Sequence, residues 1–208
     1  MEKPMVITIS REYGSGGRDI ARLISDKLGI PYYDQEITKM AAKKSGLSDE
    51  VLQQNDEVAS TSILGSFMAG SYFFANQSYN AGELTINDRL YLLEAEIIRV
   101  LAEQESCVIV GHCADYILKD CKHALRVFVH ADLEFRKQHA VEFYGVDEKK
   151  IEDFLYKQDK HRAHYYSFYT DQKWRLIENY DLTVNSARFG INAAVEMIIQ
   201  AAKIKLGT

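Results

Sequence analysis

The stretch ISREYGSGGRDIA, residues 9–21, places a glycine-rich turn between an apolar run and a helical pattern. Residues 5–9 (MVITI) are apolar and largely β-branched, which is typical of a buried parallel strand. After the turn, apolar residues recur at Ile20, Leu23 and Ile24, and the pattern stops at Gly29, which predicts a helix. Three glycines in four positions at such a strand-to-helix turn are typical of a phosphate-binding loop.

The alternation of short apolar runs and helical patterns continues along the chain. Further strands are expected over 30–34, 107–111, 125–131 and 180–186. Helices are expected over 35–46, 48–57, 87–104, 114–120, 132–145, 147–174 and 191–206, with Asn87 and Asp132 as N-caps and Gly145 as a stop. Five strands separated by helices predict an α/β fold with a mainly parallel sheet.

Composition limits the class of protein. The 208 residues suffice for one sizeable core, and we expect a single domain over 1–208. The net charge of −5 argues against a dedicated nucleic-acid binder. The chain has no apolar run long enough to cross a membrane, and its first apolar run is too short for a signal peptide. The odd number of cysteines, three, favours reduced thiols and a cytoplasmic protein.

Residues 57–86 interrupt the regular alternation. They contain few charges, many small residues and several aromatic side chains, and they show neither a strand period nor a clean helical face. We interpret them as an insertion that covers a ligand, which would be the acceptor of a transfer reaction, or that joins subunits of a homo-oligomer. An ordinary buried helical hairpin explains the composition equally well.

Ligands of parallel α/β proteins bind at the carboxyl ends of the strands. In this sequence those ends carry 10–17, Asp34, 111–112, 131–132 and 185–186. A dinucleotide-binding fold is a minor alternative, which would make the protein an oxidoreductase. Gly14 and Gly16 follow a strand, and Asp34 ends the next one. However, Asp19 stands where the third glycine should be, and the turn before Gly14 is too wide.

The width of the turn fits the phosphate-loop pattern G-x-x-x-x-G-K-S/T better, although the lysine is missing. In one register Gly16 is the second glycine and Gly17 replaces the lysine. In the other, Gly17 is the second glycine, Arg18 replaces the lysine, and Asp19 replaces the hydroxyl residue. Asp19 either holds Mg²⁺ or only complements the helix dipole, and a plain tight turn is the alternative for the whole loop.

With the loop, the YYD strand end (32–34), VIVGH (108–112), DKHRAHYY (159–166) and YDLTVNS (180–186) assembled, the chain resembles the cytidylate kinase-like family. The resemblance covers nearly the whole chain, and its loop segment is the most specific part because this family's loop lacks the usual lysine. It implies a P-loop kinase-like three-layer α/β/α fold, ATP as phosphoryl donor, Mg²⁺, and a nucleoside monophosphate or similar small acceptor. It also implies a helical lid over 147–175.

The same resemblance implies site residues. Asp159 and Arg162 match an Asp-x-x-Arg pair that contacts the acceptor, since i and i+3 share a helix face; an exposed ion pair is the alternative. The chain departs from the family pattern at Gly111-His112-Cys113, where cytidylate kinases have Gly-Arg-Asp. The expected catalytic residues are Arg18, Arg136 and Arg162, and the expected metal ligand is Asp19. The donor is expected to bind to Gly14, Ser15, Gly16, Gly17, Arg18 and Asp19. The acceptor is expected to bind to Asp34, His112, Asp159 and Arg162.

Two functions follow from these residues. The first is an ATP-dependent phosphotransferase, favoured by the loop width and the retained arginines. The second is a catalytically weak, nucleotide-binding regulatory protein, favoured by the missing lysine and the altered Gly-Arg-Asp segment. Phosphoryl transfer depends on positioning and charge neutralisation more than on a covalent nucleophile, and for that reason we favour the kinase.

Overall fold

The structure is a computed structural model, and it describes residues 3–45 and 86–207. The expected helix over 48–57 and the insertion over 57–86 lie outside the described residues, apart from Ile86, where a helix begins. The chain divides into two compact units. One consists of Met1–Asp34 with Ile98–Thr208, and the other of Gln35–Ile97. All residues of the candidate site belong to the first unit.

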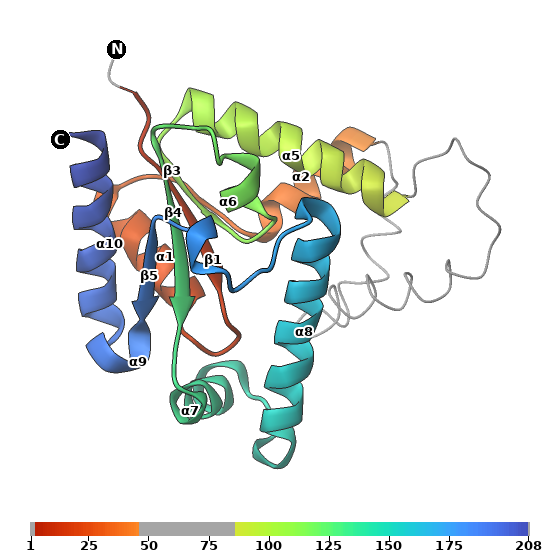
Figure 1. Ribbon diagram of the computed structural model, residues 1–208, viewed down its shortest axis with the longest axis vertical. Helices are drawn as coiled ribbons and strands as arrows, with labels where there is room; N and C mark the ends of the chain where they lie inside the picture. The colour runs from red at the N-terminus through yellow and green to blue at the C-terminus, as the bar shows by residue number, and fades with distance from the viewer. Residues whose placement is uncertain (1–2, 46–85, 208) are drawn as a thin grey trace. The chain divides into compact units, whose positions relative to one another are not determined.

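A five-stranded sheet forms the centre of the first unit (Figure 1). Its strands are β1 (Val6–Arg11), β2 (Tyr32–Tyr33), β3 (Cys107–Val110), β4 (Ala124–His130) and β5 (Leu182–Asn185), in the order β2-β3-β1-β4-β5. Every pairing in this sheet is parallel, which confirms the predicted α/β fold. The dinucleotide-binding alternative is wrong, because β3 separates β1 from β2, whereas that fold pairs its first two strands.

Alternation along β1 explains the layers of this unit, because successive side chains of a strand point to opposite faces. Ile7 and Ile9 pack with α1 (Gly17–Leu28) and α10 (Ile191–Leu206) in the main core. On the other face, Ser10 accepts a hydrogen bond from Trp174 Nε1 at 2.8 Å. Each fully buried isoleucine contributes about 1.5–3 kcal/mol through the hydrophobic effect.

The second face is completed by α6 (Ala114–Ile117) and α8 (Ile151–Thr170), as Figure 1 shows. Tyr166 of α8 donates a hydrogen bond to the carboxylate of Asp115 in α6 at 2.6 Å. Both residues are buried, and burial raises the pKa of Asp115 to about 6. This contact fixes the carboxyl end of α8 to the segment that follows β3.

The remaining helices include two that the sequence analysis did not predict, at 177–179 and 186–189. They are α2 (Gln35–Ser45), α5 (Ile86–Gln104), α7 (Leu133–Tyr144), α9 (Ser186–Phe189) and the short 3₁₀ helices η2 (Glu148–Lys150) and η3 (Ile177–Asn179). Asn87 is not the N-cap of α5, because the helix already begins at Ile86. Asp132 does occupy the N-cap position of α7, but its side chain pairs with Arg188 at 3.2 Å instead of capping. Within the described residues, no helix has the length and apolar character that a bilayer crossing requires.

Candidate functional site

The glycine loop connects the carboxyl end of β1 to the first turn of α1. Gly14 and Gly16 adopt left-handed conformations, with φ of 77° and 72°, and α1 begins at Gly17. Gly16 is therefore the N-cap of the helix. A helix that begins at Gly17 favours the first of the two registers, in which Gly17 occupies the lysine position.

The backbone of this loop presents unpaired donors. Among the described residues, no protein acceptor forms a hydrogen bond with the amide N–H groups of Gly14, Gly16, Gly17, Arg18 or Asp19. Residues 14–17 are nevertheless buried. Buried N–H groups are nearly always paired in folded proteins, and a helix N-terminus attracts negative charge. The loop is therefore built to accept an anion.

Helix α7 lies directly against the loop at the carboxyl end of the strands (Figure 1). A Cβ atom on Gly14 would overlap the carbonyl oxygen of Arg136, so only glycine fits there. Arg136 also donates from Nε to the carbonyl oxygen of Tyr13 at 2.8 Å. The conformation of the loop and the position of α7 consequently depend on each other.

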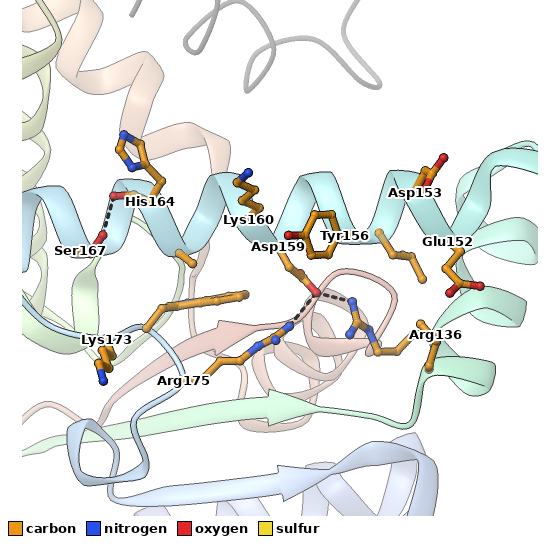
Figure 2. Close-up of a pocket in the computed structure, with 14 residues that line it drawn as sticks. Arg136, Glu152, Asp153, Tyr156, Asp159, Lys160, His164, Ser167, Lys173 and Arg175 are labelled. Carbon is orange, nitrogen blue, oxygen red and sulfur yellow. Dashed lines mark hydrogen bonds and ion pairs between the residues drawn. The ribbon is translucent and has the colours of Figure 1, made fainter.

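One flank of the loop carries a charge-balanced set of four residues, Glu12, Arg136, Asp159 and Arg175, which we call the balanced network. Arg175 bridges the two carboxylates, at 2.8 Å from Glu12 and 3.0 Å from Asp159. Arg136 also pairs with both of them. Figure 2 shows Asp159 pointing from α8 toward the two arginines. Its second oxygen accepts from the amide N–H of Tyr13 at 2.9 Å, which ties α8 to the loop.

The opposite flank, toward β3 and β2, carries the cation-rich cluster, which consists of Arg11, Arg18, Asp34 and Arg162. Arg18 Nε lies 2.7 Å from Asp34, and Arg11 lies 3.5 Å from the same carboxylate. Arg162 donates to the carbonyl oxygen of Arg11 at 2.9 Å and stands over the ring of Tyr13. Among the described residues, no carboxylate lies within ion-pair distance of Arg162. The cluster thus has three guanidinium groups and one carboxylate.

The excess of positive charge is reflected in the pKa values. Burial raises the pKa of Asp34, but Arg11 and Arg18 outweigh this effect and hold the pKa below its usual range. Burial, with Arg11 and Arg18 nearby, lowers the pKa of Arg162 to about 9. Arg162 therefore stays protonated at neutral pH, in surroundings that favour the arrival of a negative charge.

Asp19 lies at the start of α1, where a metal ligand was predicted. Its carboxylate accepts a hydrogen bond from Tyr144 at 3.3 Å and lies 3.4 Å from His139 Nε2. Burial lowers the pKa of His139. Residues 3–45 and 86–207 contain no group of three His, Cys, Asp or Glu side chains that could hold a metal ion.

Comparison with known proteins identifies the family of this chain. The model of the cytidylate kinase-like family matches residues 6–188. The chain belongs to this family. A cytidylate kinase of Archaeoglobus fulgidus is 24% identical over 206 residues, which cover 97% of this chain and 96% of the relative. A cytidylate kinase of Sulfurisphaera tokodaii is 22% identical over 167 residues, covering 79% and 77%.

Solved structures with the same fold include an uncharacterized protein from Eubacterium ventriosum, with 27% identity, a TM-score of 0.68, and coverage of 96% of this chain and 98% of that one. A shikimate kinase from Bacteroides thetaiotaomicron has a TM-score of 0.51 at 13% identity, with the same coverage, and it shows the fold alone. Family and fold together support a P-loop kinase-like phosphotransferase.

In this cytidylate kinase-like chain, Asp159 and Arg162 lie on one side of α8, as predicted, but they contact different groups of residues. Asp159 joins the balanced network and Arg162 the cation-rich cluster. Their predicted alternative, an exposed ion pair, is wrong because both contact the loop and Asp159 is buried. His112 Nε2 lies 2.8 Å from the backbone oxygen of Asp34, in a turn where His112 and Cys113 both have positive φ.

The sequence analysis did not single out Arg11 or Glu12 as site residues, and it considered Arg175 only as a substitute for a missing lid arginine. Arg11 and Glu12 were considered only because one of them occupies the position of the first glycine of the phosphate-loop pattern. Two charged residues at the end of a buried strand could by themselves have indicated a functional site. Arg175 also lines a cavity of about 790 Å³ beside α8, together with Lys160, Lys173 and Trp174 (Figure 2). The balanced network forms one wall of this cavity through Arg136, Asp159 and Arg175.

Proposed function

We propose that this protein transfers the γ-phosphoryl group of ATP to a nucleoside monophosphate or a similar small acceptor. The observation that carries the proposal is the set of unpaired amide donors of Gly14, Gly16, Gly17, Arg18 and Asp19, in a largely buried loop beside the cation-rich cluster. Such an arrangement positions phosphates and neutralises their charge, which is most of what phosphoryl transfer requires.

In this proposal the donor lies along the loop. The phosphates accept hydrogen bonds from the backbone of Gly14, Ser15, Gly16 and Gly17, and from Arg18 and Asp19 at the helix N-terminus. ATP supplies the phosphoryl group, and Mg²⁺ neutralises the charge on its phosphates. Asp19 fits as a metal ligand, because it is the carboxylate of the first turn of α1 and its side chain is partly exposed.

The acceptor lies on the flank toward β2 and β3. Arg162 would bind an anionic group of the acceptor with its forked donors, while Asp34 and His112 lie at the ends of β2 and β3. Asp159 reaches an acceptor only when the balanced network opens, because both of its oxygens are engaged within the protein. Arg136 acts from the same network on the donor side.

The segment 147–175 serves as the lid in this proposal. Its helix α8 contacts the loop through Asp159 and Arg162, so that it must move for a nucleotide to enter the buried loop. Return of the lid would expel water and strengthen each charged contact. A cytoplasmic location and an acceptor-binding or subunit-joining role for 57–86 belong to the same proposal.

A catalytically weak, nucleotide-binding regulator is the second candidate. It is favoured by Gly17 at the lysine position and by the ion pair that holds Arg18 against Asp34. In this version the nucleotide would move α8 without transferring a phosphoryl group.

The two candidates are distinguished by turnover. We would incubate the protein with ATP, Mg²⁺ and each common nucleoside monophosphate and measure diphosphate formation. We expect one acceptor to be phosphorylated, with kcat lowered by about 10²-fold in Arg18→Ala because a charged donor to the phosphates is lost. Arg126→Ala is the matched control, since Arg126 pairs with Asp181 far from the loop. ATP binding without turnover on any acceptor would leave the regulator.

A further inference from the structure

Arg11 is the last residue of β1 and stands directly before the loop. Its side chain is only 15% exposed, and its guanidinium group faces the cation-rich cluster. Phosphate loops normally begin with a small residue near this position. A buried arginine at this position calls for a physical explanation, because burial lowers the pKa of Arg11 and thus opposes its charge.

The stem of Arg11 occupies the space of the missing lysine. A Cβ atom on Gly17 would lie 2.5 Å from Cβ and 3.0 Å from Cγ of Arg11, far inside van der Waals contact. Gly17 has no positive φ and forms the first turn of an ordinary helix, so that its backbone does not require glycine. The lack of a side chain at position 17 is therefore explained by the side chain at position 11, whose Cβ atom alone already leaves too little room.

A second glycine, Gly111, leaves room for the other end of the same side chain, although its own φ of 79° already favours glycine. A Cβ atom on Gly111, at the carboxyl end of β3, would overlap Nη1 of Arg11. The guanidinium group thus passes closely over the backbone between β1 and β3. Two glycines on different elements leave space for one arginine, which places its charge beside Asp34 and the end of β3, on the flank of the loop that carries the cation-rich cluster.

The charge of Arg11 is only partly compensated. Its nearest carboxylate, Asp34, lies at 3.5 Å and is held more closely by Arg18 at 2.7 Å. Arg162, which carries a further positive charge, hydrogen-bonds to the backbone of Arg11. The excess positive charge at this point matches a polyanion.

We propose that Arg11 supplies, from the end of β1, the cation that a lysine at position 17 would supply to the donor phosphates. The inference rests on the proposed phosphate-binding role of the loop. A guanidinium group can bind two phosphate oxygens at once, which a lysine cannot. The loop is then a phosphate loop with its cation moved six positions toward the N-terminus.

A charge-relocation experiment tests this. Binding of ATP and of inorganic triphosphate is measured by calorimetry for the natural chain, Arg11→Ala, Gly17→Lys and the double variant Arg11→Gly/Gly17→Lys. We expect Arg11→Ala to weaken both ligands about 10- to 100-fold, as for loss of a hydrogen bond to a charged group. Gly17→Lys alone should also weaken binding, because the two side chains collide. The double variant should recover at least tenfold, because glycine at position 11 also removes the Cβ atom that a side chain at position 17 would meet.

Each outcome decides a different point. Equal affinities in Arg11→Ala and the natural chain would overturn the inference, as would a double variant no better than Arg11→Ala. Failure of the natural chain to bind either ligand would overturn both the inference and the proposed function. Arg11-dependent binding without phosphorylation of any acceptor would overturn the kinase alone. If Arg11→Ala does not fold, Arg11→Met keeps the stem against Gly17 and tests the charge by itself. Arg126→Ala controls for general loss of an arginine.

Discussion

The two flanks of the glycine loop use the same side chains in opposite ways. The balanced network sets two arginines against two carboxylates, and its central carboxylate is satisfied on both oxygens. The cation-rich cluster sets three arginines against one carboxylate. The first needs nothing further to be neutral, whereas the second lacks negative charge.

This difference separates positioning from binding. A buried, neutralised network holds elements in place, and here it joins the loop to α7 and α8. A buried excess of one charge is costly unless a ligand of opposite sign arrives. The comparison predicts that substitutions in the network change stability first, and that those in the cluster change anion affinity first.

The largest effect is expected from Asp159→Ala in the balanced network. It leaves Arg136 without one of its two carboxylate partners and leaves the Tyr13 N–H unpaired, which should cost about 3–5 kcal/mol of unfolding free energy. Urea denaturation measures the loss. Asp159→Asn is the control, because it still accepts from Tyr13 and should lose less. Equal, small losses in both variants would contradict a structural role for the network.

The next effect concerns the contact between the loop and α7. Gly14→Ala should cost about 3 kcal/mol, because φ is 77° and the new Cβ would meet the backbone of Arg136. Gly29→Ala is a matched control, with φ of 63° and no atom within 4 Å, and should cost about 1 kcal/mol. Thermal unfolding of both variants gives the difference. An equal loss of stability in both variants would mean that α7 can shift away from the loop without a measurable cost.

The sequence predicts those parts of the fold and site that depend on residues close together in the chain. It does not predict contacts between residues that are far apart in the chain. The parallel sheet and the turn at Gly14 and Gly16 follow from local hydrophobic period and local backbone requirements. The pairing of Asp159 with Tyr13 joins residues 146 apart in the chain, and no local pattern specifies it. The spacing of Asp159 and Arg162 placed both on one side of α8. It could not show that one faces α7 and the other β1.

Asp34→Asn in the cation-rich cluster should have a smaller effect on stability than the two preceding substitutions, and it should strengthen anion binding. Removing its one carboxylate should lower stability by about 1–2 kcal/mol and raise affinity for inorganic triphosphate about fivefold. The pKa of Asp34 is lowered in the folded protein, so that its stabilising effect is present above about pH 4, the unfolded value, and is lost as the pH falls further.

Titration calorimetry at neutral pH, and urea denaturation between pH 3 and 7, check these two expectations. The stability difference between Asp34→Asn and the natural chain should shrink below about pH 4. A decrease in triphosphate affinity in this variant would contradict the excess of positive charge.

The smallest loss of stability is expected from Asp181→Asn, which removes an ion pair that lies outside both flanks of the loop. Asp181 pairs with Arg126 and Lys205 near the amino end of the sheet, and although partial burial opposes it, these partners lower its pKa to about 2. Because the pair is partly exposed, Asp181→Asn should cost only about 0.5–1 kcal/mol, with no change in triphosphate affinity. Parallel denaturation and calorimetry test both expectations, and a larger loss would weaken the contrast between buried and exposed pairs.

The hydrogen bond from Ser186 Oγ to the carbonyl oxygen of Ser15, at 2.6 Å, joins residues 171 positions apart. On the ribosome, Ser15 is therefore made 171 positions before Ser186. The binding loop has to wait for the synthesis of the residues between them before it acquires all of its contacts. A nascent chain arrested shortly before Ser186 can already contain β1 to β4 and still lack a finished phosphate cradle.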